Sequence, residues 1–228
     1  PGPILSQKLN KDNYKKYQNI EKAIHFLEFQ KEALQITREK LPKNKSLIGF
    51  VGGPWTVINY ALEKDDTINL ENDSFIFNYI KETLIPLLIK NIKLQIDGGA
   101  EIVMILDSGL SNIHSNNLEK YYSYFLKDLS RSYSDNIAYY ARGVSETEFF
   151  KFCNLNFAGL GCDSSVDLKN VLKKNEYKFF QGNFDQNKML LEKDDLKKEL
   201  EIYCNDFLSL TPKERAGWIC GLGHGIDK

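Results

Sequence analysis

Short apolar segments alternate with longer amphipathic segments along the chain. Six of the short segments predict strands, because they are almost continuously apolar, as parallel strands buried on both faces are. They cover residues 46–51, 101–106, 136–140, 157–160, 177–180 and 217–222. Strands that alternate with helices favour right-handed crossovers and one parallel sheet. Six strands suit either an open doubly wound sheet or part of a (β/α)8 barrel.

Helical spacing of apolar residues fills the intervals between these strands. Four apolar residues share one helical face ahead of the first strand: Ile20, Ala23, Ile24 and Leu27. The stretch 79–94 also has helical spacing, and Pro86 within it predicts a kink or a break. Further helices are predicted at 118–129, 146–152, 167–172 and 190–208. Since no internal boundary is visible, we expect a single domain over residues 1–228.

Composition and charge argue against several classes of protein. The 228-residue chain is 42% hydrophobic and 27% charged, which suits a globular domain with a sizeable core. A formal net charge of −1 gives no field that would attract nucleic acid or a membrane surface. No signal peptide is visible, and the longest apolar run, residues 84–89, is too short to span a bilayer. We therefore expect a cytoplasmic protein with neither a nucleic-acid nor a membrane partner.

Cysteine and arginine usage narrows the candidate chemistry. The four cysteines show no C-x-x-C pair and no histidine at zinc-ligand spacing, so we predict neither a disulfide nor a metal site. Cys162 and Cys220 lie in apolar runs, where a thiol behaves as a small buried hydrophobe. Arginine is the better planar clamp for carboxylates, yet the chain has only Arg38, Arg131, Arg142 and Arg215.

Small and polar residues follow each of the six predicted strands. In order they are Gly52-Gly53-Pro54-Trp55-Thr56 with Tyr60 beyond, Asp107-Ser108-Gly109, Arg142-Gly143, Asp163, Gln181-Gly182-Asn183-Phe184-Asp185 and Gly223-His224-Gly225. Ligands of parallel α/β folds bind at the carboxyl ends of the strands, so this pattern predicts one site assembled from the whole chain. No G-x-G-x-x-G or P-loop lysine follows a strand, which disfavours a dinucleotide or nucleoside triphosphate site.

Most of these residues also have a purely structural interpretation. Trp55 and Tyr60 taken alone suit core aromatics with a satisfied polar end. Asp107 or Ser108 is suited to cap the following helix. Asp163 reads as a helix N-cap and Asp185 as a turn residue, while His25 and His114 are expected on the surface. His224 favours a functional role, because flanking glycines permit close approach and an imidazole titrates near neutrality.

Five segments, taken together and in order, resemble the uroporphyrinogen decarboxylases. Residues 46–56 match that family's "LIGF-x-G-x-PWT" segment, and Tyr60 follows at the family's spacing. Residues 100–108 resemble "GA…(I/F)FDSW", residues 181–185 resemble "QGNLDP", and residues 222–226 resemble "LGHGI". Residues 1–5 resemble the "GPV" lead-in to the family's middle region. The spacing of these segments agrees from one end of the chain to the other.

The resemblance implies a fold and a reaction. The fold is a (β/α)8 TIM-type barrel, of which this chain supplies about six βα units. The reaction is decarboxylation of the four acetate side chains of uroporphyrinogen to give coproporphyrinogen in haem and porphyrin biosynthesis. It needs no cofactor and no metal, and the family is commonly homodimeric. The expected catalytic residues are Tyr60, Ser108 and His224, and the expected substrate-binding residues are Trp55, Leu106 and Asp107. Arg142, at a strand end, is our own candidate for a substrate clamp.

The departures from the family pattern leave two other readings open. An arginine-rich "MRQAGRY-x-PEY" segment and an "SDI" segment, which supplies the family's central aspartate, have no counterpart here, so we expect an incomplete barrel that begins after both. Gly109 replaces the family's tryptophan, Ala141-Arg142-Gly143-Val144 replaces a "GKGA"-like turn, and Gln186 replaces a proline. One alternative is a degenerate, non-catalytic homologue. The other is a methyltransferase of the same barrel superfamily, acting with a corrinoid or thiol partner.

Overall fold

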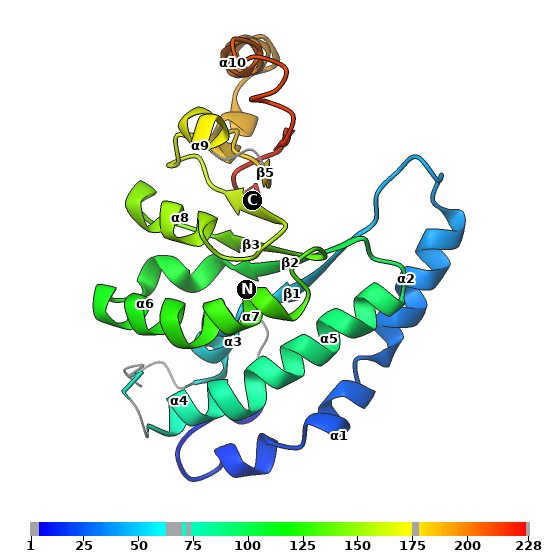
Figure 1. The fold of residues 1–228 in the computed structure, drawn as a ribbon, viewed down its shortest axis with the longest axis vertical. Coiled ribbons are helices and arrows are strands. Elements are labelled where there is room, and N and C mark those ends of the chain that lie inside the picture. Colours follow the sequence, from blue (N-terminus) through cyan, green and yellow to red (C-terminus); the bar gives the residue numbers. More distant parts are fainter. Residues whose placement is uncertain (1–4, 63–69, 72–73, 175–177, 227–228) are drawn as a thin grey trace.

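Six parallel strands form a single sheet in the order of the sequence (Figure 1). The computed structural model describes residues 5–62, 70–71, 74–174 and 178–226. The strands are β1 (Ile48–Gly52), β2 (Ile102–Asp107), β3 (Ile137–Ala141), β4 (Gly159–Cys162), β5 (Phe179–Gln181) and β6 (Trp218–Ile219). Each pairs in parallel with the next. Consecutive order with crossovers between neighbours is the arrangement of six units of a (β/α)8 barrel, as predicted.

Helices precede β1 and fill each interval between the strands. Before β1 lie η1 (Tyr14–Tyr17), α1 (Ile20–His25) and α2 (Glu28–Lys40). Between β1 and β2 lie α3 (Pro54–Ala61), α4 (Phe75–Tyr79), η2 (Ile80–Leu84) and α5 (Ile85–Asp97). After β2 come η3 (Ser108–Asn112), α6 (Ser115–Tyr121), η4 (Tyr122–Leu126) and α7 (Lys127–Ser132). The later intervals contain α8 (Glu146–Cys153), α9 (Leu168–Lys174), η5 (Gln186–Leu190) and α10 (Lys193–Leu208).

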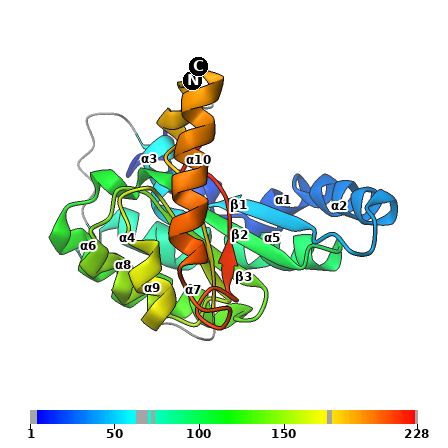
Figure 2. The ribbon, with the colours of Figure 1, turned by 90° about the horizontal axis from the view of Figure 1, so that it is seen from above.

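The core lies between the sheet and the helices that cover its outer face. In Figure 2, α6, α8 and α9 lie on one side of the strands, while α1 and α2 extend on the other. Outward-facing strand residues such as Val103, Tyr139 and Leu160 are fully buried beneath the helices. On β1 the pattern alternates, and Phe50 is 69% exposed because its side of the sheet faces the hollow at the strand ends. Within the described residues, no helix has the length and apolarity needed to cross a membrane.

Two helices were missed, and of the two outcomes predicted at Pro86, a kink or a break, the break is wrong. Helix α2 is mostly polar and has no buried residue. Helix α3 begins at Pro54, directly after two glycines. Neither segment was therefore recognised as a helix in the sequence. Pro86 does not break its helix, because it falls at the start of α5, immediately after the π-helical turn η2. A proline lacks an N–H and its ring crowds the preceding turn, and the wider π-helical turn there accommodates both.

Strand β4 lies two residues later than predicted. The sequence interpretation placed it at 157–160, with Phe157 inside it, but it covers Gly159–Cys162. The two glycines are there because neighbours press on them: a Cβ at Gly159 would meet the Phe179 ring at 2.4 Å, and one at Gly161 would meet Tyr140 at 2.9 Å. Phe157 instead stacks on Tyr139 with ring centroids 5.2 Å apart. Part of the predicted strand 177–180, Tyr177, lies outside the described residues.

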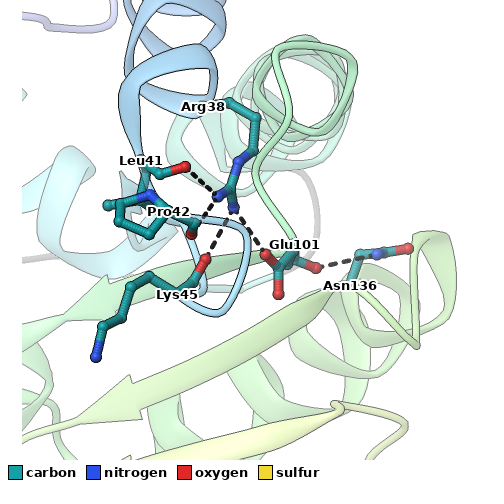
Figure 3. A network of polar contacts seen from close by, with 6 residues as sticks. All are labelled: Arg38, Leu41, Pro42, Lys45, Glu101 and Asn136. Atoms are coloured by element: carbon teal, nitrogen blue, oxygen red, sulfur yellow. Dashed lines mark hydrogen bonds and ion pairs between the residues drawn. The ribbon is translucent and has the colours of Figure 1, made fainter.

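Arg38 is a structural arginine at the amino-terminal ends of the strands (Figure 3). Its guanidinium donates hydrogen bonds to the carbonyl oxygens of Leu41, Pro42 and Lys45, at 2.9 to 3.1 Å, and to Glu101 Oε1 at 3.1 Å. The amide of Asn136 donates to the backbone oxygen of Glu101 at 3.1 Å. Together they tie α2 to the segments that enter β1, β2 and β3. Because this edge is opposite the carboxyl ends, Arg38 is no candidate for ligand binding.

Candidate active site

Side chains from the ends of separate strands line one cavity. One part, of about 490 Å³, includes Leu106, Ser108, Tyr140 and His224, together with apolar residues of β1 and β2. The adjoining part, of about 570 Å³, is lined by Thr56, Asn59, Tyr60, Ser108, Gly109, Ser111, Arg142 and His224. Because Ser108 and His224 belong to both parts, the two form one hollow with an apolar floor and a polar rim. Five of the seven predicted site residues are on its wall: Leu106, Ser108, Tyr60, Arg142 and His224.

Helix α3 carries Tyr60 into the rim of this cavity. The tyrosine side chain is 49% exposed, so the interpretation of Tyr60 as a core aromatic is wrong. Trp55, one turn earlier on the same helix, faces the opposite way and is 3% exposed. Its ring meets that of Tyr121 edge-on, at 5.8 Å between centroids. The structure therefore corrects the assignment of Trp55 as a substrate-binding residue and places it in the core.

Asp107, the last residue of β2, is buried behind the cavity rather than exposed in it. None of its surface is accessible. Oδ1 accepts hydrogen bonds from Thr56 N at 2.7 Å and Thr56 Oγ1 at 2.8 Å. Oδ2 accepts from the hydroxyls of Tyr121 at 2.5 Å and Tyr139 at 2.9 Å. Asp107 thus does not face a ligand, and the helix that it caps is α3, which precedes it in the chain, rather than the one that follows.

The chemistry of this buried carboxyl is set by two opposing effects. Burial raises the pKa of Asp107 above its ordinary value, and the hydrogen bonds from Tyr121, Thr56 and Tyr139 oppose that rise. All the groups around it can donate, and a carboxylate only accepts. For the two tyrosines, burial raises the pKa well above the ordinary value, and the nearby Asp107 raises it further. Tyr121 and Tyr139 are therefore neutral hydroxyl donors.

Arg142 and His224 approach each other across the mouth of the cavity. Arg142 Nη1 lies 3.3 Å from His224 Nε2, and His224 Nδ1 lies 3.3 Å from the oxygen of Gly225. A guanidinium can only donate, so Nε2 accepts and the imidazole proton is on Nδ1. In this arrangement Arg142 brings the positive charge to the mouth, and Nε2 of His224 accepts from its guanidinium.

The turns on either side hold this pair in place. Gly143 has a φ of +67°, a conformation that favours glycine, and its N–H donates to Asp163 Oδ2 at 2.5 Å. The Tyr140 hydroxyl donates to the oxygen of Gly223 at 2.8 Å. A Cβ at Gly223 would lie 2.8 Å from Ser164 N, which explains that glycine, whereas no described residue lies within 4 Å of a Cβ at Gly225. Arg142 and His224 are thus fixed by the ends of β3, β4 and β6.

Of the remaining residues interpreted from the sequence, some are placed as predicted and others are not. Asp163 is not the N-cap of α9, because its Oδ1 accepts from Ser165 N, at 2.9 Å. The carboxylate that accepts from an amide of α9, Asn170 N, is that of Asp167. Asp185 is a turn residue as predicted, accepting from Asn187 N at 2.9 Å. His25 and His114 are exposed and Cys162 is buried, as predicted. Cys220 is exposed, contrary to prediction, because it follows the edge strand β6.

Several wall residues were not singled out from the sequence. Thr56 was quoted within a motif, but it also lines the cavity, and its hydroxyl donates to Asp107. Asn59 precedes Tyr60 on α3, and Ser111 belongs to η3. Tyr140 faces the cavity while Tyr139 is buried on the opposite face of β3. Strand parity was the one available signal for Tyr140, since successive strand residues point to opposite faces.

Sequence comparison decides the family. A family model described as "Uroporphyrinogen decarboxylase (URO-D)" matches residues 1–228. The chain belongs to the uroporphyrinogen decarboxylase family. Proteins named uroporphyrinogen decarboxylase from Hydrogenobaculum sp. and Orientia tsutsugamushi (strain Ikeda) are 27% identical over 237 residues and 31% identical over 207 residues. These alignments cover 99% and 86% of this chain but 65% and 59% of the relatives. The chain therefore spans about three fifths of the length of these decarboxylases.

Solved structures place the fold among barrel proteins. A methyltransferase from Methanosarcina mazei superposes with a TM-score of 0.61 at 17% identity, covering 86% of this chain and 58% of that one. A B12-independent methionine synthase from Shewanella sp. W3-18-1 gives 0.57 at 12% identity, covering 85% and 59%. At such low identity these neighbours bear on the fold alone.

Across the described residues, no group of three or more His, Cys, Asp or Glu side chains could hold a metal ion.

Proposed function

We propose that the protein carrying this chain removes the acetate carboxyl groups of uroporphyrinogen, giving coproporphyrinogen for porphyrin and haem biosynthesis. Family membership supports a carboxy-lyase of this general kind. The observation that carries the proposal is the convergence of Tyr60, Ser108, Arg142 and His224 on one cavity. These four side chains come from segments that follow β1, β2, β3 and β6. Hydroxyl, guanidinium and imidazole groups at one rim suit a substrate whose periphery is made of carboxylates.

The two parts of the cavity match the two parts of such a substrate. Its apolar floor includes Ile48, Phe50, Met104, Leu106 and Leu222, which suit the faces of the pyrrole rings. Its polar rim suits the acetate and propionate arms. Of the residues expected to bind substrate, Leu106 keeps that role in the proposal as part of the floor.

The proposed reaction breaks the bond between the acetate methylene and its carboxyl carbon. The electron pair left behind moves into a pyrrole that has been protonated on a ring carbon. A proton then adds to the methylene carbon in place of the lost CO2, and the ring carbon gives up its own proton, which restores the pyrrole. In this scheme Tyr60 and Ser108 hydrogen-bond the carboxylate of the reacting arm and hold it in line for the bond to break. Their contribution is orientation and stabilisation of developing charge. No step requires a cofactor or a metal.

Arg142 and His224 have complementary parts in the proposal. Arg142 pairs with a carboxylate of the macrocycle, replacing its present bond to His224 Nε2. Nε2, once released, faces the cavity as a base or, after protonation, as a donor. The homodimer implied by family resemblance belongs to the same proposal, and the mass in solution would test it.

Two substitutions test the site assignment in the protein expressed from its natural gene. We expect His224→Ala and Tyr60→Phe each to lower turnover of uroporphyrinogen by about tenfold or more, on the order of 1.4 kcal/mol of barrier. Tyr124→Phe is the matched control, since Tyr124 is 47% exposed on the outer helical layer, away from the cavity. The assignment fails if His224→Ala and Tyr60→Phe both stay within about threefold of the unsubstituted protein, roughly 0.65 kcal/mol. A homologue without catalytic function would show no turnover to lose.

A further inference from the structure

The inner end of helix α3 has no side-chain cap of its own. Its N-cap residue is Gly53, which offers no side-chain acceptor. The first N–H groups of a helix otherwise lack partners, and leaving them unpaired away from water is costly. Here Asp107 Oδ1 accepts from Thr56 N, and the Tyr121 hydroxyl accepts from Trp55 N at 3.1 Å. The end of α3 is thus held by side chains from β2 and α6.

The same carboxylate also fixes the turn that carries Ser108. Thr56 Oγ1 donates to Asp107 Oδ1 and accepts from Gly109 N at 2.9 Å. Ser108 is the residue between Asp107 and Gly109, so both of its neighbours are tied to the same threonine. The Tyr121 hydroxyl donates to Oδ2 while it accepts from Trp55 N, which links that oxygen to α3 as well. Thr56 Oγ1 and the Tyr121 hydroxyl each make two of these hydrogen bonds, so the position of α3 and the position of the turn after β2 depend on each other.

The arrangement is closely packed as well as hydrogen-bonded. A Cβ on Gly53 would lie 2.3 Å from Asp107 Cγ, so the helix end sits directly against the carboxylate. Asp107, Tyr121 and Tyr139 have no exposed surface. A buried network whose members are all satisfied is rigid, and removing a member that joins two segments frees those segments from each other.

We infer that Asp107, Thr56 and Tyr121 form a positioning relay that holds Tyr60 on α3 and Ser108 after β2 in register on the same cavity wall. The inference rests on the proposed function for its catalytic consequence and on geometry alone for its structural one. Asp107 and Tyr121 touch no ligand in this account; they act through the two hydroxyl-bearing residues that face the cavity. Small misplacements of such groups lower turnover strongly.

Tyr139 provides a matched control for Tyr121. Both hydroxyls donate to Asp107 Oδ2, both side chains are fully buried, and substitution by phenylalanine removes one hydroxyl from each. Only the Tyr121 hydroxyl also accepts from α3, through Trp55 N. The ring of Tyr139 stacks on Phe157, and its hydroxyl donates to Asp107 Oδ2 from β3, beside the Tyr121 hydroxyl. A merely structural role predicts similar consequences for the two substitutions, whereas a positioning role predicts different ones.

The experiment compares Tyr121→Phe with Tyr139→Phe in the protein expressed from its natural gene. Hydrogen exchange of the Trp55 and Thr56 amides is measured first, under conditions in which the two variants have equal global stability. We expect exchange at Trp55 to rise about tenfold or more in Tyr121→Phe and less than about threefold in Tyr139→Phe. Equal acceleration in both variants would overturn the relay, whether or not the protein turns over uroporphyrinogen.

Steady-state kinetics supplies the second readout. Tyr121→Phe is expected to lower kcat about tenfold while KM changes less than about threefold, because the reacting groups are displaced rather than removed. Tyr139→Phe should retain kcat within about threefold. Thr56→Val should lose kcat, and Thr56→Ser, which keeps the hydroxyl between Asp107 and Gly109, should recover most of it. Parallel losses of kcat in both tyrosine variants would overturn the inference, whereas absence of turnover by the unsubstituted protein would overturn the proposed function.

Discussion

Arg142 Nη1 lies 3.3 Å from His224 Nε2, which joins the turn after β3 to the segment after β6 across the cavity mouth. The pair brings together residues 82 positions apart in the sequence. Because the guanidinium must be the donor, this contact gives His224 its tautomer as well as its place. Under the proposed function, an incoming carboxylate competes with the imidazole for Arg142, so binding of the anion is coupled to release of Nε2.

Substitution of Arg142 should mainly weaken substrate binding. We expect Arg142→Met to raise KM for uroporphyrinogen about tenfold, since a charge-assisted hydrogen bond contributes roughly 1.5 to 3 kcal/mol. The KM of Arg142→Lys should lie between those of Arg142→Met and the unsubstituted protein, because an ammonium keeps the charge but not the planar pair of donors. Arg131→Met is the control, as Arg131 is exposed on α7 beside Asp128. Equal KM values for Arg142→Met and Arg131→Met would remove Arg142 from the site.

A methyl group at Gly53 should destabilise the fold. Its carbon would lie 2.3 to 2.5 Å from three atoms of Asp107, a fully buried side chain that four hydrogen bonds hold in place. We expect Gly53→Ala to lower the free energy of unfolding by about 2 to 3 kcal/mol, as overpacking of a core does.

Gly225→Ala is the corresponding control at the cavity mouth. In the part of the chain that the structure describes, nothing lies within 4 Å of a Cβ added there. The expected change is within about 0.5 kcal/mol. Urea titrations of both variants give the comparison, with the slope checked for constancy. Similar midpoints for the two variants would mean that α3 does not press on Asp107 in solution.

Stability should fall at alkaline pH because buried tyrosines resist ionisation. Burial raises the pKa of Tyr203 from 10.0 to about 12, and it also raises the pKa of Tyr140. A tyrosine that ionises at pH 10 when unfolded and near 12 when folded keeps its proton longer in the folded state. Its stabilising contribution is complete below pH 10 and is lost as the pH rises toward 12.

Unfolding free energies measured between pH 8 and 12 test this dependence. We expect a plateau followed by a decline from about pH 10 upward. Tyr203→Phe should lower stability at neutral pH, because its hydroxyl donates to Gly182 O at 2.7 Å, yet should decline less steeply above pH 10. Identical alkaline slopes for Tyr203→Phe and the unsubstituted protein would show that Tyr203 does not contribute.

The parallel sheet and the edge that carries the site could be predicted from sequence, because both follow from local patterns. Buried parallel strands are continuously apolar, and their carboxyl ends share one edge. That logic placed Ser108, Arg142 and His224 on a common wall although they lie far apart in the chain. It was less accurate at β4, which begins two residues later than predicted, because Gly159 and Gly161 are both strand residues packed against the rings of Phe179 and Tyr140.

The division of labour within the predicted site could not be read from sequence. Trp55 and Tyr60 share a helix, and only its orientation makes one a core residue and the other a wall residue. Asp107 and Ser108 are adjacent, yet one is sealed behind the sheet and the other faces the cavity. Two of the residues that hydrogen-bond Asp107 are Thr56 and Tyr139, which lie 51 and 32 positions away from it in the sequence. No local pattern reports such tertiary hydrogen bonds.

The most direct test of the proposed function is anaerobic incubation of the protein, expressed from its natural gene, with uroporphyrinogen. Products are oxidised to porphyrins and separated by their number of carboxyl groups. The account predicts successive loss of the four acetate carboxyls, ending at coproporphyrinogen, without added metal or cofactor. Recovery of uroporphyrinogen with all its carboxyl groups, from folded protein that binds the macrocycle, would contradict it.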